Sequence, residues 1–260
     1  FIKNREGTPI LGVITAKPPH FLSASERDKV LSIEHMLIDV GARNRAEVED
    51  EMGIDIGATI VPQSTFQAMH NPQRFVSKAF DNRVGMALAI QSAQELSQSP
   101  HPNHLHHAGS VQEEVGARGA QTLGQLTQPD VALVLEGPPA DDLPGTPKDE
   151  QQGAIGRGVQ LRLHDPTAIA NPKLVHFVRE TADKHHIPHQ ISVRRNGGTD
   201  ARILHTFGPG VPTIVLGVPA RYTHTANSII DINDYLTALK LILALSQSLD
   251  CDTVHRLVSF

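Results

Sequence analysis

Short apolar runs separated by turn-forming residues fill the first part of the chain. The runs lie at residues 10–14, 36–40 and 58–61, with glycines and prolines between them. Short strands bounded by turns give this pattern. We therefore predict a small β-rich domain over residues 1–74, with one short capped helix at residues 44–49.

The pattern changes after residue 74, where stretches with helical spacing alternate with short apolar stretches. Apolar positions over residues 82–98 recur at helix-compatible spacings, which predicts a helix. Residues 131–135 are uniformly apolar and predict a buried strand, and residues 107–112 are a further strand candidate.

The C-terminal part continues this alternation of helices and strands. Asn171-Pro172 predicts a helix start, because proline is favoured in the first helical turn. Residues 212–217 predict a short buried strand, and Asn233 is the predicted cap of the closing helix. Residues 75–260 are therefore expected to form an α/β sandwich with a mixed central sheet flanked by helices.

Composition excludes several classes of function. The 260 residues are 39% hydrophobic and 20% charged, with a formal net charge of -5 and no block of basic residues. Nucleic-acid binding needs clustered Lys and Arg and is not expected. Membrane insertion is not expected either, because no apolar run reaches the ~20 residues of a spanning helix. Cys251 is the single cysteine, so no internal disulfide can form, which is compatible with the cytoplasmic location that we expect.

Polar side chains gather where the predicted strands end, which is where open α/β sheets place their ligands. Glu113 and Glu114 follow one strand candidate. Adjacent carboxylates at a strand end point to opposite sides, so one can bind a metal while the other faces the substrate as a general base. The alternative for this pair is a solvated acidic turn.

Three further residues extend this candidate site. For each one, a purely structural role is the alternative to metal binding. Asp81 begins a predicted helix and could serve as its N-cap. Glu136 ends an apolar strand, where a carboxylate is costly to bury without a cation or donor. His224 lies in a polar turn after the strand at 212–217 and could be a surface histidine.

Together, these carboxylates and one imidazole, from four predicted strand ends, could form a site for zinc, cobalt or manganese. A carboxylate such as Asp81 can bridge two ions, and a paired site activates water. The histidine-rich stretch at residues 101–107 is a second metal candidate, but its prolines and its lack of carboxylates favour a loop.

Four ordered motifs carry a resemblance to a known family. They are VSKAFDNR at residues 76–83, QEEVGARGA at 112–120, GTDA at 198–201, and the segment from GVP at 210–212 to RYTH at 221–224. In order and spacing these motifs resemble the tetrahedral-aminopeptidase family of metallopeptidases, which includes glutamyl aminopeptidases. The likeness extends across nearly the whole chain.

The resemblance implies a phosphorylase/hydrolase-like catalytic fold and a role for each candidate residue. Asp81 would bridge two divalent ions, zinc or cobalt with manganese as a further option, and Glu113 would be the general base. Glu114 and His224 would bind one ion. Glu136 would bind the other, at a position where the family usually has Asp.

The resemblance also implies partners. Residues 1–74 correspond to a dimerisation domain inserted within the catalytic domain, the substrates are peptides, and homo-oligomers are expected, as dimers or as dodecamers built from them. The family's first metal-binding His lies in a His-x-Asp segment upstream of that domain, and no residue here matches it. We therefore expect a chain truncated at its start that is weakly active or inactive by itself.

The function expected is that of a metal-dependent aminopeptidase, in which Glu113 takes a proton from the attacking water and returns it to the leaving amine. One alternative is a related amidohydrolase or deacylase that uses the same metals. Another is a non-catalytic remnant that keeps the dimerisation module. The sequence predicts no preference among substrate residues.

Overall fold

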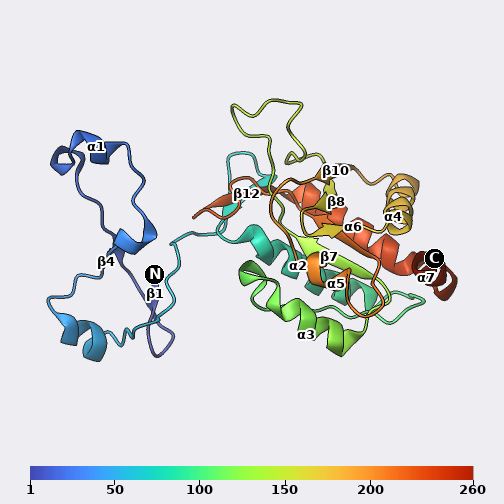
Figure 1. The fold of residues 1–260 in the computed structure, drawn as a ribbon, viewed down its shortest axis with the longest axis horizontal. Helices are drawn as coiled ribbons and strands as arrows, with labels where there is room; N and C mark the ends of the chain where they lie inside the picture. The colour runs from blue at the N-terminus through green and yellow to red at the C-terminus, as the bar shows by residue number, and fades with distance from the viewer. Residues whose placement is uncertain (260) are drawn as a thin grey trace. The chain divides into compact units, whose positions relative to one another are not determined.

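The computed structural model describes residues 1–259, and the chain divides into two compact units, Phe1–Gln63 and Ser64–Phe260 (Figure 1). We call them the N-terminal and C-terminal units. Strand β5 (Gln67–Ala68) pairs antiparallel with β6 (Arg74–Ser77), which ties the residues before 74 to the C-terminal unit. The domain division near residue 74 stays a prediction.

The N-terminal unit consists of short elements joined by long connections. Strands β1 (Ile2–Lys3) and β2 (Pro9–Ile10) form one antiparallel pair, and β3 (Val13–Ile14) and β4 (Ile38–Asp39) form another. Its helical segments are η1 (Pro19–Phe21), α1 (Ala24–Arg27), η2 (Ile33–His35) and the π-helical η3 (Glu47–Glu51). Among its described residues, Ile2 is the one buried hydrophobic side chain. The unit therefore has almost no core of its own.

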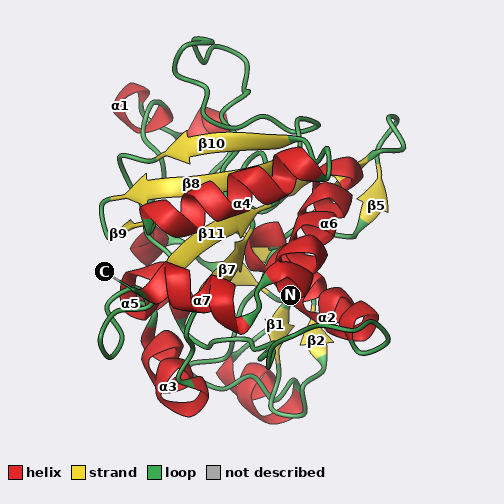
Figure 2. Cartoon of the chain, turned by 90° about the vertical axis from the view of Figure 1, so that its right-hand side faces the viewer, coloured by secondary structure: helices red, strands yellow, loops and turns green. Residues whose placement is uncertain are grey.

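A mixed sheet forms the centre of the C-terminal unit (Figure 2). Its order is β10 (His189–Val193), β8 (Val159–Asp165), β11 (Thr213–Gly217) and β7 (Ala132–Glu136), and β9 (Ala168–Ile169) pairs with β8. The β10–β8 and β11–β7 pairs are parallel, whereas β11 runs antiparallel to β8. The predicted mixed central sheet is confirmed.

The remaining elements surround this sheet. A smaller sheet has the order β12 (Ser228–Asp231), β6 and β5. The helices are α2 (Phe80–Leu96), α3 (Arg118–Thr127), α4 (Pro172–Lys184), α5 (Ala201–Leu204), α6 (Ile232–Ser248) and α7 (Cys251–Val258), together with the 3-10 helix η4 (Glu113–Val115). Within residues 1–259 no helix is long and apolar enough to cross a membrane.

Alternation along the strands supplies an apolar surface to both faces of the central sheet. Ile214 and Leu216 of β11 belong to the main core cluster, which includes residues of α2, α4 and α6. Val215, between them, belongs to a second cluster with Ala201 and Leu204 of α5. Successive strand residues point to opposite faces, so β11 packs against helices on both sides. The predicted α/β sandwich is therefore confirmed.

The N-terminal caps of two helices, α4 and α6, test the helix starts that the sequence predicts. The Asn171 side chain accepts hydrogen bonds from the backbone N of Lys173 at 2.9 Å and of Leu174 at 3.2 Å, so the predicted start of α4 is confirmed. The cap predicted at Asn233 is wrong. Asp231 caps α6 and accepts from the Asn233 backbone N at 3.0 Å.

The strand predicted at residues 107–112 is also absent from the described structure. The Val111 carbonyl accepts a hydrogen bond from the Gly119 backbone N at 2.9 Å. The Val111 carbonyl is therefore hydrogen-bonded within the turn that precedes α3 and not to a neighbouring strand.

Candidate metal centre

Asp81 lies at the start of α2, but its backbone is not helical. Its φ and ψ are -81° and 107°, and its peptide bond to Asn82 is cis. The Asn82 side chain donates to the Leu135 carbonyl at 2.8 Å and accepts from the Gly85 backbone N at 3.0 Å. These bonds fasten the segment to β7. Asp81 makes no cap hydrogen bond, so its side chain is available to the cavity described below.

Glu113 and Glu114 lie on η4, a single turn, and not at the end of a strand as expected. The Glu113 carbonyl accepts from the backbone N of Gly116 at 3.0 Å and of Ala117 at 2.8 Å. A Cβ built on Gly119 would lie 2.4 Å from the Val111 backbone N. Close packing around that glycine holds the turn that carries both carboxylates.

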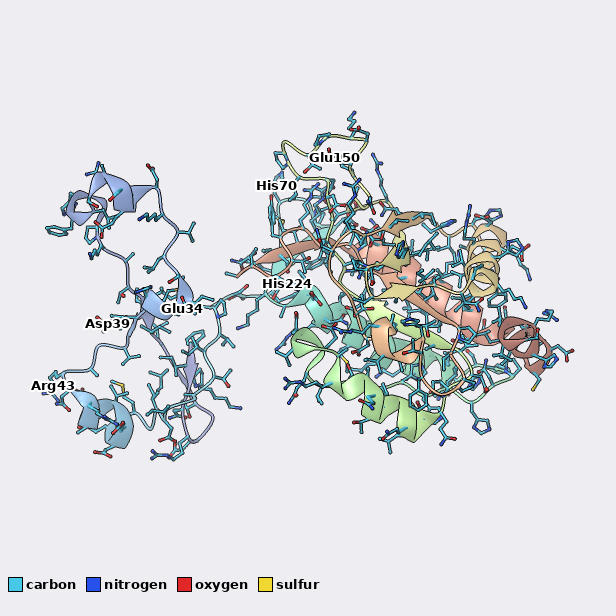
Figure 3. All side chains as sticks on the ribbon, viewed as in Figure 1. Glu34, Asp39, Arg43, His70, Glu150 and His224 are labelled. Atoms are coloured by element: carbon cyan, nitrogen blue, oxygen red, sulfur yellow. The ribbon has the colours of Figure 1, made fainter. Side chains whose placement is uncertain are left out.

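Glu136 lies at the carboxyl end of strand β7. His224 follows the carboxyl end of β11, which runs parallel to β7. Glu136 is the last residue of β7 and is paired in register with Gly217. His224, labelled in Figure 3, has a positive φ of 63° and an exposed side chain. Non-glycine residues rarely adopt such φ values, and they concentrate at functional sites. Ala79, Gln112, Ala117 and Tyr222, which flank the other candidate residues, share this conformation.

The structure brings all five predicted residues to one cavity of about 270 Å³. His224 Nε2 lies 3.0 Å from Asp81 Oδ2 and 3.4 Å from Glu114 Oε2. Ligand atoms of these three residues all lie within 4.8 Å of one another. Glu113 and Glu136 line the same cavity but do not belong to this three-residue group.

Burial and like charges perturb these carboxyl groups. Burial, followed by the charge of Asp200, raises the pKa of Glu113 to about 7. Burial and the charge of Glu114 raise the pKa of Asp81, although His224 opposes this. Burial, followed by the charge of Asp81, raises the pKa of Glu136 well above 4.5. The cluster thus concentrates negative charge that a cation would stabilise.

Glu136 provides a separate test of whether the site suits a metal. It is 7% exposed, and within residues 1–259 its side-chain carboxylate has no hydrogen bond or ion pair. A buried carboxylate without a partner is strongly unfavourable unless a cation compensates. Carboxylate oxygen and imidazole nitrogen are donors that suit zinc and related divalent ions. The donor set therefore fits a divalent metal.

Sequence reasoning missed two charged residues beside the cavity. Arg162 lines it from β8, a strand that was not predicted, although Val159, Leu161 and Leu163 alternate there with polar residues. This alternation was the available signal. Asp200, within the GTDA motif, is half-buried and accepts a very short hydrogen bond from the Ser110 hydroxyl.

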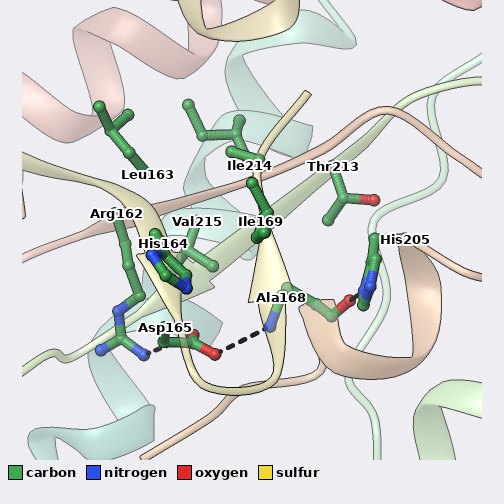
Figure 4. Close-up of a pocket in the computed structure, with 12 residues that line it drawn as sticks. Arg162, Leu163, His164, Asp165, Ala168, Ile169, His205, Thr213, Ile214 and Val215 are labelled. Carbon is green, nitrogen blue, oxygen red and sulfur yellow. Dashed lines mark hydrogen bonds and ion pairs between the residues drawn. The ribbon is translucent and has the colours of Figure 1, made fainter. Parts of the chain in front are cut away.

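A second, smaller cavity lies at the turn between β8 and β9 (Figure 4). Asp165 forms this turn by accepting from the Ala168 backbone N at 3.1 Å and from Arg162 Nη1 at 3.4 Å. The volume, about 10 Å³, is no larger than one water molecule requires. This cavity is part of the packing of the turn.

Comparison with known proteins agrees with this geometry. The family model of the M42 glutamyl aminopeptidases matches residues 1–241. The chain belongs to the M42 glutamyl aminopeptidase family. Members of the M42 family are metal-dependent aminopeptidases, so this chain has the fold of a peptide-bond hydrolase.

Two curated M42 relatives are similar over most of this chain. The glutamyl aminopeptidase of Lactococcus lactis subsp. cremoris (strain MG1363) is 32% identical, over 98% of this chain and 71% of its own length. The lysyl aminopeptidase of Pyrococcus furiosus (strain ATCC 43587 / DSM 3638 / JCM 8422 / Vc1) is also 32% identical, over 92% of this chain and 67% of its own length.

Solved structures of M42-like enzymes superpose closely. The TET aminopeptidase of the marine sediment archaeon Thaumarchaeota archaeon SCGC AB-539-E09 has a TM-score of 0.92 and 36% identity, over 99% of this chain and 72% of that one. The TET1 peptidase of Pyrococcus horikoshii, described as assembling into a tetrahedron or a large octahedral shell, has a TM-score of 0.80 and 28% identity, over 95% of this chain and 71% of that one.

Proposed function

We propose that Asp81, Glu114, Glu136 and His224 hold the divalent ions of an aminopeptidase. Glu114 and His224 would hold one ion, Glu136 would hold the other, and Asp81 would contribute to both. The convergence of Asp81, Glu114 and His224 within 4.8 Å is the observation that carries this proposal. The burial of Glu136 without a partner among the described residues supports the second position.

The donor set favours zinc or cobalt, with manganese as a further option. When bound, such ions polarise the scissile carbonyl and make water acidic enough to attack at neutral pH. The three carboxylates and the imidazole fix where this chemistry takes place.

Glu113 is the general base of the proposed reaction. It lines the cavity beside the three-residue group without belonging to it, so its carboxylate is free for proton transfer. One carboxylate oxygen accepts a proton from the attacking water, and the same group then donates this proton to the nitrogen of the leaving amine. A carboxyl group at this position can both accept and donate the proton.

Substitution of the base tests this assignment. In cobalt-supplemented assays of aminoacyl-p-nitroanilide hydrolysis, Glu113→Gln should lower kcat by roughly 10²–10⁴-fold, because the amide cannot accept the proton. Cobalt content should not change. Glu180→Gln, an exposed site on α4, is the matched control and should keep the original rate.

A Glu113→Gln protein with the original kcat would contradict the assigned base. A chain that binds cobalt but shows no turnover before any substitution would instead fit the non-catalytic alternative.

We also propose that the N-terminal unit mediates self-association of peptide-hydrolysing subunits into dimers or dodecamers. Its apolar side chains are largely exposed, notably Leu11, Val13, Ile14, Phe21, Val30 and Ile33. Exposed apolar patches of this kind mark interaction surfaces. A similar solved structure, PhTET1-12s, is described as a dodecamer in the asymmetric unit. The molar mass in solution, measured by light scattering, distinguishes a monomer from a dimer or a dodecamer.

We propose a cytoplasmic location as well. Cys251 is an exposed free thiol, and reduced cysteines are usual in that compartment.

A further inference from the structure

Two adjacent aspartates in the segment after β7 each form an ion pair with an arginine. Asp141 Oδ2 accepts from Arg194 Nη1 at 2.5 Å. Asp142 accepts from Arg221 Nε at 2.9 Å and from Arg221 Nη2 at 2.5 Å. None of these four side chains is more than 23% exposed. Short, largely buried contacts between a guanidinium and a carboxylate restrict geometry as well as contributing energy. Each aspartate therefore fixes the segment to which its arginine belongs.

The two arginines lead into different parts of the cavity wall. Arg194 follows β10 and precedes residues 196–199, which line the cavity between β10 and α5. Arg221 follows β11 and precedes the turn with His224, which lines the cavity at the proposed metal centre. The two aspartates are consecutive in the chain, but they hold separate walls.

His224 depends on its turn because its imidazole has little other support. Its Nε2 faces Asp81 Oδ2 at 3.0 Å and Glu114 Oε2 at 3.4 Å, and its side chain is 67% exposed. Among the described residues, its Nδ1 has no hydrogen bond. A metal-binding histidine usually donates its second ring nitrogen to a partner that fixes the ring. Without such a partner in the described chain, the backbone of the turn must set the position of the imidazole.

The turn that carries His224 is anchored at Arg221. Tyr222 and His224 have positive φ values of 60° and 63°, which non-glycine residues keep only where the surroundings hold them. The Arg221 backbone N donates to the Ile229 carbonyl at 2.9 Å, and its carbonyl accepts from the Ile229 backbone N at 3.1 Å. Both bonds lie on the β12 side of the turn. Asp142 is the group that fixes Arg221 from outside the turn.

We propose that Asp142 is a positioning residue, which holds Arg221 and thereby places the imidazole of His224 to bind a divalent ion. Asp141 lacks this role, because Arg194 leads to the other wall. The inference rests on the proposed metal centre and adds a residue outside the cavity lining. The plainer alternative is that Asp142 holds only its own segment, since it also accepts from the Ile155 backbone N at 3.3 Å.

Cobalt affinity separates these two roles. In calorimetric titration of the metal-free chain with cobalt at pH 7, Asp142→Asn should weaken binding by about tenfold, as loss of an outer partner of a ligand does. Asp141→Asn disrupts the matching ion pair one residue away and should keep the original affinity. An unchanged affinity in Asp142→Asn, or an equal loss in both variants, would overturn the proposal.

The visible absorption spectrum of bound cobalt identifies the ligand that is affected, because the spectrum depends on the ligands and their geometry. His224→Ala at saturating cobalt gives the reference spectrum of a centre without the imidazole. Asp142→Asn should shift toward this reference, and Asp141→Asn should keep the spectrum of the unsubstituted chain. An unchanged spectrum in Asp142→Asn would overturn the proposal even with a weaker affinity, because the imidazole would still be in place.

A second substitution keeps the test open if Asp142→Asn does not fold. Arg221→Lys keeps the charge without the planar fork, so it should weaken cobalt binding and shift the spectrum in the same direction. Unchanged values in Arg221→Lys would then refute the assignment. Cobalt binding by the unsubstituted chain separates the two levels of the account. Bound cobalt that Asp142→Asn does not affect refutes this inference alone, and absence of bound cobalt refutes the proposed function.

Discussion

Glu136 is the most buried carboxyl group of the site. It is 7% exposed, and its carboxyl group has no hydrogen bond or ion pair among the described residues. Burial, and then the charge of Asp81, raises its pKa well above the ordinary 4.5. Without metal, ionising this buried carboxyl group therefore opposes folding. A divalent ion would reverse that effect, so one residue links metal binding to stability.

The stability of the metal-free chain should therefore depend on Glu136. In urea unfolding with a chelator at pH 8, Glu136→Gln should raise the free energy of unfolding by on the order of 1–3 kcal/mol, because it removes a buried carboxyl group that is unfavourable to ionise. The folded pKa lies above the unfolded value of 4.5, so the stability of the original chain falls as pH rises above 4.5.

The glutamine variant should lack this part of the pH dependence, and Glu180→Gln, an exposed control, should retain it. Identical slopes between pH 5 and pH 8 in all three proteins would refute the role given to Glu136.

Sequence motifs located the candidate residues but not their surroundings. Asp81 and His224 are 143 positions apart, and their contact at 3.0 Å exists only in the folded chain. The order of the motifs predicted that both residues belong to one metal site. Arg162 belongs to no motif, and its burial beside the cavity is a property of packing.

Among the elements, the segment between β7 and β8 contributes Gly137, Pro138 and Pro139 to the cavity wall. Arg221 donates to both carboxylate oxygens of Asp142, at 2.9 Å and 2.5 Å. Gly156 and Gly158 each donate a backbone N–H to Asp234 at 2.6 Å. These bonds hold both ends of the segment, while Glu150, labelled in Figure 3, lies on its exposed part.

Loss of one anchor should loosen this segment. Asp142→Asn cannot accept both guanidinium bonds and should lower the free energy of unfolding by about 1–3 kcal/mol. Amide hydrogen exchange over residues 137–158 should become faster. Asp149→Asn, at an exposed position of the same segment, is the control and should change neither quantity. Unaltered exchange in Asp142→Asn would show that the ion pair does not hold the segment.

Elements with an uninterrupted apolar pattern were predicted, whereas strands with buried polar residues were not. Strands β7 and β11 are apolar until they reach the site, and α2 and α4 have clear helical spacing. Strands β8 and β10 carry inward polar residues such as Gln160 and Ser192, which interrupt the apolar pattern. The strand expected at 107–112 was wrong because Val111 bonds to the turn before α3.

In the molecule as a whole, the mixed sheet explains why separated motifs meet. Parallel strands β7 and β11 end at the same edge, so Glu136 and the turn with His224 lie together. The start of α2 is fastened to β7 by Asn82, which brings Asp81 to that edge. This arrangement belongs to the M42 fold that the chain shares with its solved relatives.

Cobalt content per chain, measured by mass spectrometry of the metal after loading at pH 7 and desalting, tests the central claim most directly. The unsubstituted chain should retain cobalt, and Asp81→Asn should lose it, because Asp81 is shared by both proposed positions. Asp149→Asn should retain the original content. Cobalt retained by Asp81→Asn, or absent from the unsubstituted chain, would contradict the proposed metal centre.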